Sequence, residues 1–153
     1  MYYGFDIGGS KVAFAVFDVA LNERERSLHP TPHQDYPAFL QLLSSLVSAA
    51  DSRWQGVGSV GVGFPGILDG EGRLLAPNVP VIHGRDLGGD LQRLLGRPVQ
   101  ADNDANCFLL SEYHQGAVAG TELALGLTLG TGVGGALIHR GRLVNSRRGG
   151  SGE

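Results

Sequence analysis

Two short glycine-rich segments, each between two apolar runs, constrain this chain more than any other feature. The first, residues 8–10, separates YYGFDI from KVAFAVFD, and the second, residues 130–135, separates LALGLTL from ALI. Glycine allows tight turns and close approach of the backbone to another group. A glycine turn between apolar, β-branched runs predicts a β-hairpin. We therefore expect two similar hairpins, the second resembling the start of a second copy of the unit.

Apolar periodicity predicts the other elements, which are strands at 24–30, 59–64 and 98–102 and helices at 35–53, 87–95 and about 103–115. Asp35 is expected to cap the first helix. In the third helix, Phe108, Leu109 and Tyr113 are expected to face inward. Early antiparallel strands followed by strand–helix alternation predict an α/β fold, a mixed sheet with helices on its faces.

This order predicts a first domain over residues 1–122 and the first hairpin of a second domain over residues 123–153. A two-stranded hairpin is not a stable domain alone. An apolar face is expected to stay exposed on it, formed by Leu123, Leu125, Leu127, Leu137 and Ile138. Self-association through this edge, including a homodimer, is an open alternative.

Composition excludes several classes of function. Twelve basic and fifteen acidic residues give a net charge of −3, which is not the footprint of a nucleic-acid-binding protein. No apolar run approaches the roughly 18 residues of a membrane span, so no membrane partner is expected. The single cysteine, Cys107, permits no disulfide within the chain and favours the cytoplasm. The five histidines show no metal-ligand spacing, and we expect no metal site built from His and Cys.

The first glycine turn is suited to an anion. A strand rather than a helix follows Lys11, which excludes a Walker A motif. The backbone N–H groups of a Gly-Gly turn can still form an anion-binding nest, to which Ser10 adds a hydroxyl and Lys11 a charge. Asp6, at the strand end, could organise Mg²⁺. A plain hairpin turn is the alternative, and this segment alone does not decide between them.

The second glycine segment partly matches the dinucleotide fingerprint G-x-G-x-x-G. That fingerprint requires a helix after the turn, whereas a strand is expected here, so we reject a Rossmann site. Two glycine hairpins in one chain could instead hold one polyphosphate from two sides.

The segment Asp102-Asn103-Asp104 joins a short strand to a helix. Asp104 lies near a helix N-terminus, where a carboxylate is stabilised and can accept a proton from a substrate hydroxyl. Asn103 offers a donor and an acceptor to a sugar. Helix capping is the simpler explanation of this segment taken alone. Gly66, after a buried strand, and Asn78, in a proline-rich loop, could line a polar pocket.

Together these segments resemble the ROK family of sugar kinases and repressors. The resemblance rests on GFDIGGSK (4–11), GFPG (63–66), APNVP (76–80), DNDANC (102–107) and LGTGVGGAL (129–137), and looks closest to bacterial N-acetylglucosamine kinases. It implies an actin-like ATPase (ribonuclease H-like) fold, ATP with Mg²⁺ as cofactors and a small sugar as substrate. The implied reaction moves the γ-phosphoryl group of ATP to the 6-hydroxyl of a hexose or N-acetylhexosamine.

The resemblance also implies roles for single residues. Asp104 would be the catalytic base and would bind the sugar together with Gly66, Asn78, Asn103 and Glu153. The ATP phosphates would contact Gly4, Phe5, Asp6, Ile7, Gly8, Gly9, Ser10 and Lys11 in the first segment and Gly130, Thr131, Gly132, Val133, Gly134, Gly135, Ala136 and Leu137 in the second.

The sequence departs from the family pattern at two places. Ser10 replaces the usual Thr but keeps the hydroxyl. The sequence ends at Glu153, ahead of the Gly-His and the Cys-rich zinc loop of the family, so we expect an incomplete active site. An inactive sugar-binding fragment or a remnant of a regulator is the alternative. A repressor is disfavoured because no DNA-binding helices precede the strand at Tyr2, and an actin- or chaperone-type ATPase because of the Asp-Asn-Asp segment.

Overall fold

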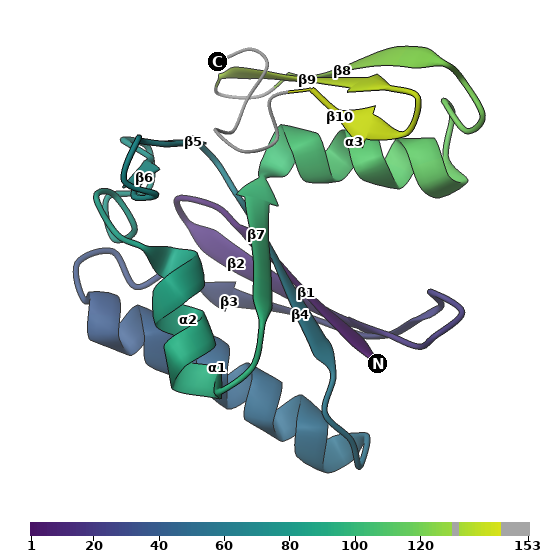
Figure 1. Cartoon of the computed structure of the whole chain (residues 1–153). Coiled ribbons are helices and arrows are strands. Elements are labelled where there is room, and N and C mark those ends of the chain that lie inside the picture. Colours follow the sequence, from purple (N-terminus) through teal and green to yellow (C-terminus); the bar gives the residue numbers. More distant parts are fainter. Residues whose placement is uncertain (130–131, 145–153) are drawn as a thin grey trace.

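The computed structural model describes residues 1–129 and 132–144. Figure 1 shows the elements in chain order, which are β1 (Tyr2–Ile7), β2 (Lys11–Phe17), β3 (Glu23–Pro30), α1 (Tyr36–Arg53), β4 (Ser59–Phe64), β5 (Ile67–Leu68), β6 (Leu74–Leu75), α2 (Leu87–Leu95), β7 (Val99–Asn103), α3 (Asp104–Gln115), β8 (Leu123–Leu129), β9 (Val133–His139) and β10 (Arg142–Leu143). Every strand and helix expected from the sequence is confirmed, with ends that differ by a few residues at most. Among the described residues, no helix has both the length and the apolar character needed to cross a bilayer.

The main sheet has the strand order β3-β2-β1-β4-β7. β1 pairs antiparallel with β2 and parallel with β4, and β4 pairs parallel with β7. This arrangement confirms the predicted mixed sheet. It also places the carboxyl ends of β1, β4 and β7 at one edge of the sheet, which is where ligands bind in open α/β folds.

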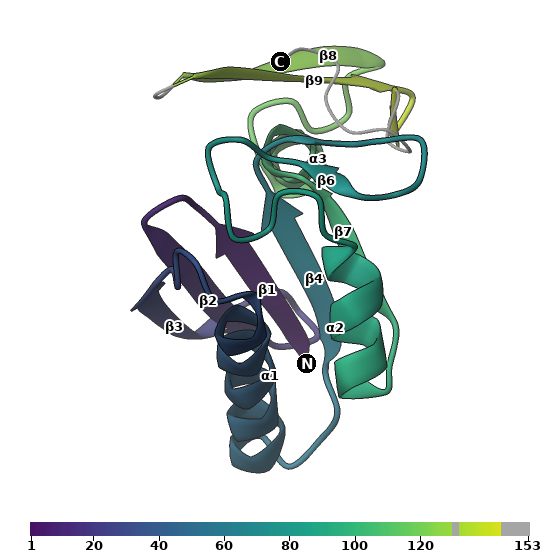
Figure 2. The same cartoon turned by 90° about the vertical axis from the view of Figure 1, so that its left-hand side faces the viewer.

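α1 and α2 cover one face of this sheet (Figure 2). α1 begins where expected, because the Asp35 side chain accepts a 2.9 Å hydrogen bond from the Ala38 N–H. α2 ends at Gly96, whose φ of +65° is the left-handed conformation common after helices. The apolar stripe of α1, formed by Tyr36, Phe39, Leu43, Val47 and Ala50, joins the inward residues of β1, β2 and β4 in one core.

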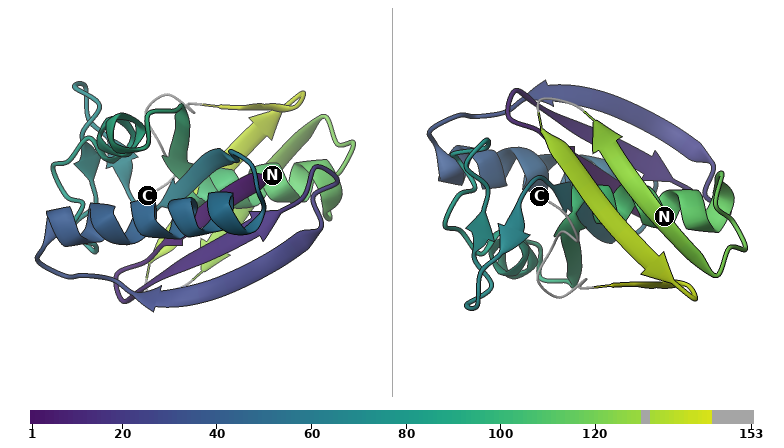
Figure 3. Two further views of the ribbon diagram at one scale, coloured as in Figure 1. Left: turned by 90° about the horizontal axis from the view of Figure 1, so that it is seen from below. Right: turned by 90° about the horizontal axis from the view of Figure 1, so that it is seen from above.

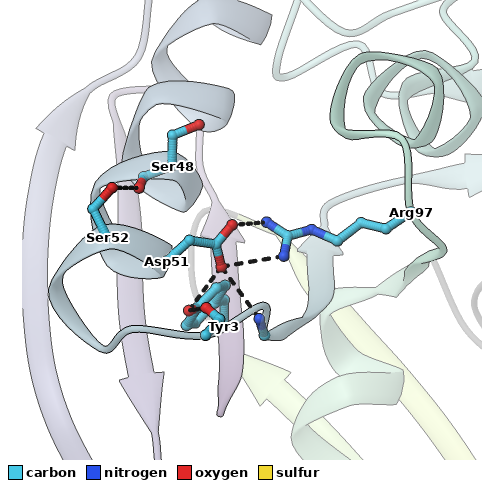
Figure 4. Close-up of polar contacts among 7 residues, drawn as sticks. Tyr3, Ser48, Asp51, Ser52 and Arg97 are labelled. Carbon is cyan, nitrogen blue, oxygen red and sulfur yellow. Dashed lines mark hydrogen bonds and ion pairs between the residues drawn. The ribbon is translucent and has the colours of Figure 1, made fainter.

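At the amino end of the sheet, Asp51 ties four segments together (Figure 4). Its carboxylate accepts hydrogen bonds from the Tyr3 hydroxyl at 3.0 Å, from both Arg97 Nη atoms at 3.2 and 2.7 Å, and from the Gly58 N–H at 3.2 Å. Burial alone would raise the pKa of Asp51, but these donors hold the pKa below its ordinary value. Burial and the contact with Asp51 raise the pKa of Tyr3 to about 12. The cluster fixes the end of the sheet opposite to the candidate site.

A second, smaller core joins α3 to the hairpin of β8 and β9, which Figure 3 shows lying across it. Leu109 is buried there as predicted, and Tyr113 packs at its edge. Phe108 is 41% exposed, so its expected inward orientation was wrong. It neighbours Leu109 on a helix that buries only one face, and so points about 100° away from that face. The division between residues 1–122 and 123–153 stays a prediction, and this core spans it.

The expected exposure of the hairpin is confirmed for Leu123, Leu125 and Leu127. It was wrong for Ile138, which is fully buried. Ile138 pairs with Ala124 on the side of the hairpin that faces α3, whereas Leu137 pairs with Leu125 on the outer side. Neighbouring residues of a strand point to opposite faces, so the two could not both be exposed.

Candidate active site

Three parallel strands deliver the candidate residues to one place. β1 leads into the turn at residues 8–10, β4 leads into Pro65-Gly66, and β7 leads into Asp104 at the start of α3. A cavity of about 810 Å³ lies at this edge, lined by Asp6, Ile7, Gly8, Gly9, Ser10, Pro65, Gly66, Ala76, Pro77, Asn78, Val79, Asp104, Thr128, Leu129, Gly132, Val133 and Gly134. The structure therefore brings together both glycine segments, the proline-rich loop and Asp104, which are far apart in the sequence.

The first glycine turn, residues 8–10, lines this cavity. The Gly8 N–H closes the turn by donating to the Lys11 carbonyl at 2.9 Å. Thr31, which is buried, donates its hydroxyl to the Gly8 carbonyl at 2.8 Å and its N–H to the Ser10 carbonyl at 3.1 Å. Within the described residues, the N–H groups of Gly9 and Ser10 donate to no acceptor. Successive free N–H groups in a turn are what an anion-binding nest requires.

Asn78 belongs to a loop whose base is closed by backbone hydrogen bonds. The Leu74 N–H donates to the Arg85 carbonyl at 2.9 Å, and the Gly84 N–H donates to the Leu74 carbonyl at 2.7 Å. Higher in the loop, the Ala76 N–H donates to His83 Nδ1 at 3.1 Å. Val79, Val81 and Ile82 anchor the loop in the main core. The 74–85 loop is thus a fixed wall of the cavity rather than a free segment.

Two glycines let the 74–85 loop approach both neighbouring turns. A Cβ added to Gly66 would lie 2.3 Å from the Leu75 carbonyl oxygen, and the φ of Gly66 is +109°. A Cβ added to Gly9 would lie 2.9 Å from the Asn78 carbonyl oxygen. No other residue type fits these contacts without movement of the backbone. The loop is therefore wedged between the turn after β1 and the turn after β4.

Asn103 joins the turn after β4 to the start of α3. Its side-chain oxygen accepts hydrogen bonds from the N–H groups of Ala105 at 2.9 Å and Asn106 at 3.3 Å, so Asn103 is the residue that caps α3. Its side-chain nitrogen donates to the Gly66 carbonyl at 2.9 Å. Asp104, the first residue of α3, is placed at the cavity by this brace.

The electrostatic character of the site is acidic. Burial of the Cys107 thiol, together with the charges of Asp102, Asp104 and Asp6, raises the pKa of that thiol to about 11. In the described part of the chain, no group of three or more His, Cys, Asp or Glu side chains could hold a metal ion. Asp6, which lines the cavity, could serve as a protein ligand for Mg²⁺, which commonly takes one or two carboxylates and completes its shell with phosphates and water.

Sequence reasoning missed Thr128. Thr128 lies in β8 and lines both the cavity and a neighbouring groove of about 690 Å³. A Cβ on Gly134 would come within 2.6 Å of the Thr128 hydroxyl, so the two residues face each other across the hairpin. Thr128 is the one polar side chain on the α3-facing side of β8, and this alternation with Ala124 and Gly126 could have identified it.

The remaining predicted residues fall outside the cavity lining, and these include Asn103, which is buried. Gly4 and Phe5 line the neighbouring groove, and Phe5 is otherwise buried in the core. Lys11 is exposed at the start of β2. Gly135, Ala136 and Leu137 continue β9 beyond the cavity. Gly130, Thr131 and Glu153 lie outside the described residues.

A family model described as the ROK family matches residues 2–153. N-acetyl-D-glucosamine kinases of Salmonella paratyphi B and Shigella flexneri are 47% identical over 148 residues, a match that covers 96% of this chain and 49% of theirs. The chain thus spans about half the length of the curated relatives it matches.

Solved structures of the family share the fold. The ROK hexokinase from Thermus thermophilus superposes with a TM-score of 0.83 at 35% identity, over 97% of this chain and 50% of that one. The ROK family glucokinase from Streptomyces griseus, solved with glucose and AMPPNP, gives 0.82 at 30% identity, over 99% and 48%. The predicted actin-like ATPase fold is confirmed, and the chain belongs to the ROK family.

Proposed function

We propose that this protein carries the catalytic base, the sugar pocket and part of the phosphate site of an ATP-dependent sugar kinase. The substrate would be a hexose or N-acetylhexosamine, with N-acetylglucosamine foremost because the 47% identical relatives are N-acetyl-D-glucosamine kinases. The observation that carries the proposal is that Asp104 lines the same cavity as the glycine turn with two free N–H groups and the loop that bears Asn78. The glucokinase solved with glucose and AMPPNP supports both ligands.

Each residue would have a definite task. Asn78 and the backbone around Gly66 would orient the sugar so that its 6-hydroxyl faces Asp104. Asn103, which is buried and bonded to Gly66 and to the start of α3, would hold these parts in position. The hydroxyl oxygen would bond to the γ-phosphorus of ATP as its proton passes to the Asp104 carboxylate, and the bond from that phosphorus to the β-bridging oxygen would break, releasing ADP. Gly9 and Ser10 N–H groups would hold phosphate oxygens. Mg²⁺, held by Asp6 and the phosphates, would neutralise charge on them.

The test measures ADP release by the 153-residue protein with N-acetylglucosamine, glucose and N-acetylmannosamine. Asp104→Asn should lower turnover by about 100- to 10,000-fold, the range expected for a general base. Asp86→Asn is the matched control, because Asp86 caps α2 away from the cavity and Asn caps equally well. Turnover that survives Asp104→Asn would refute the assignment of the base.

A second candidate, a sugar-binding module without catalysis, would need only the part of the cavity formed by the loop that bears Asn78 and the turn at Gly66. Calorimetric titration with the same three sugars separates the two. Binding without ADP release in the wild type would favour this module, and release of ADP would exclude it.

A further inference from the structure

The 74–85 loop, which runs from β6 almost to α2, folds as a series of turns (Figure 1). The Val79 N–H donates to the Ala76 carbonyl at 3.0 Å, which closes a β-turn over Pro77 and Asn78. Proline and asparagine are favoured at the central positions of such turns. The position of Asn78 in the cavity wall is therefore set by Ala76, the first residue of its turn.

Two further turns bring His83 back against Ala76. The Ile82 N–H donates to the Val79 carbonyl at 3.1 Å, and the His83 N–H donates to the Pro80 carbonyl at 3.2 Å. The His83 ring then accepts the Ala76 N–H at Nδ1, at 3.1 Å. Ala76 is only 2% exposed, so water is a poor substitute for this acceptor.

This contact requires an uncharged ring. A backbone N–H can only donate, so Nδ1 must carry a lone pair, and the neutral imidazole holds its hydrogen on Nε2. An imidazolium carries a hydrogen on both nitrogens, so Nδ1 and the Ala76 nitrogen would then be two donors that face each other. His83 is exposed, so a proton can reach it while the fold stays intact. Histidine is the side chain that takes up a proton between about pH 8 and about pH 5.

Within the described residues, no ion pair offsets this change. The charged side chains of the loop base and of α2 are all engaged elsewhere, and these are Asp69, Glu71, Arg73, Arg85, Asp86, Asp90 and Arg93. None of the ion pairs in the described ranges includes His83. Protonation would therefore remove the hydrogen bond to Ala76 without putting an ion pair in its place.

We propose that His83 is a positioning residue for Asn78. The neutral imidazole holds Ala76, and with it the turn that carries Asn78, in the cavity wall, and uptake of a proton releases that turn. The effect on the loop follows from these contacts alone. Its consequence, weaker sugar binding in acid, rests on the proposed function.

The first test follows deuterium uptake by residues 74–79 with mass spectrometry, corrected for the effect of pH on exchange in an unstructured chain. In the wild type, protection of this segment should fall on the order of tenfold between about pH 8 and about pH 5.5. His83→Asn should keep the segment protected at both pH values, because Asn offers an acceptor oxygen near the place of Nδ1 and takes up no proton. His83→Ala should lose protection at both. His139→Ala is the matched control, at an exposed histidine that ends β9 away from the cavity.

The second test is calorimetric titration of the same proteins with N-acetylglucosamine. In acid, the dissociation constant should rise about three- to tenfold for the wild type and stay level for His83→Asn, and for His83→Ala it should be high at both pH values. Wild-type protection that does not change with pH, or protection that still falls in acid in His83→Asn, would overturn the proposal. So would a dissociation constant that stays level in a wild type whose loop opens. A wild type that binds no sugar at either pH would instead refute the proposed function, and the exchange data would still decide whether His83 holds the loop.

Discussion

Replacing Gly66 by Ala adds a single methyl group and should destabilise the folded protein strongly. Its φ of +109° lies in the range that residues with a Cβ avoid, a conflict that costs about 1–3 kcal/mol. The new Cβ would lie 2.3 Å from the Leu75 carbonyl oxygen and 3.1 Å from the Ala76 Cα, which are backbone atoms that cannot rotate away. Forcing extra volume into a packed site adds about 1–3 kcal/mol. We expect a total loss of about 4 kcal/mol of unfolding free energy.

Gly72→Ala separates the two contributions. Gly72 has a φ of +81° but no atom within 4 Å of an added Cβ, so it reports backbone strain alone, about 1–2 kcal/mol. Urea unfolding followed by the fluorescence of Trp54, the single tryptophan, gives both values. Equal losses in the two variants would refute the argument that the 74–85 loop is wedged against Gly66. Gly66→Ala should also weaken N-acetylglucosamine binding, because displacement of the 74–85 loop would move Asn78 as well.

Three further predictions concern single contacts. Asp51→Ala should cost about 2–3 kcal/mol of unfolding free energy at neutral pH. Because the folded pKa of Asp51 is depressed, its contribution is present above the ordinary carboxyl pKa and is lost as pH falls through the folded value, so acid melts of wild type and variant should converge. Thr31→Val should lower the free energy of unfolding, measured in urea, by about 2 kcal/mol because it leaves the Gly8 carbonyl without this donor, and a loss below about 0.5 kcal/mol would contradict this. Burial and nearby carboxylates raise the pKa of Cys107 to about 11, so this thiol should react with iodoacetamide at pH 8 roughly a hundredfold more slowly than free cysteine, measured by mass spectrometry; similar rates would contradict these surroundings.

Much of the fold could be predicted because its determinants are local. The apolar stripe of α1, the Asp35 cap and the glycine turn after β1 are each readable within a few residues. The outward orientation of Phe108 could not be predicted, because it depends on which face of α3 meets a hairpin that begins fifteen residues later.

The residues that hold the candidate site in position could not be predicted from the sequence. Asp104, Asn78 and the first turn were predicted by residue type, and the structure places them on one cavity. The groups that hold them, Thr31 and His83, looked ordinary because each acts through a contact with a backbone atom elsewhere in the chain. Hydrogen bonds between a side chain and the main chain seven or more residues away follow no spacing that the sequence displays.

The wedged loop has a consequence for how substrate preference can evolve. Gly9 and Gly66 meet the loop at carbonyl oxygens of the main chain, not at side chains. Exposed side chains of the loop, such as Asn78 and Leu75, can therefore be exchanged without disturbing the packing that positions the loop. Under the proposed function, selection on sugar choice would act on one set of atoms and selection on architecture on another, so that one scaffold could serve different sugars.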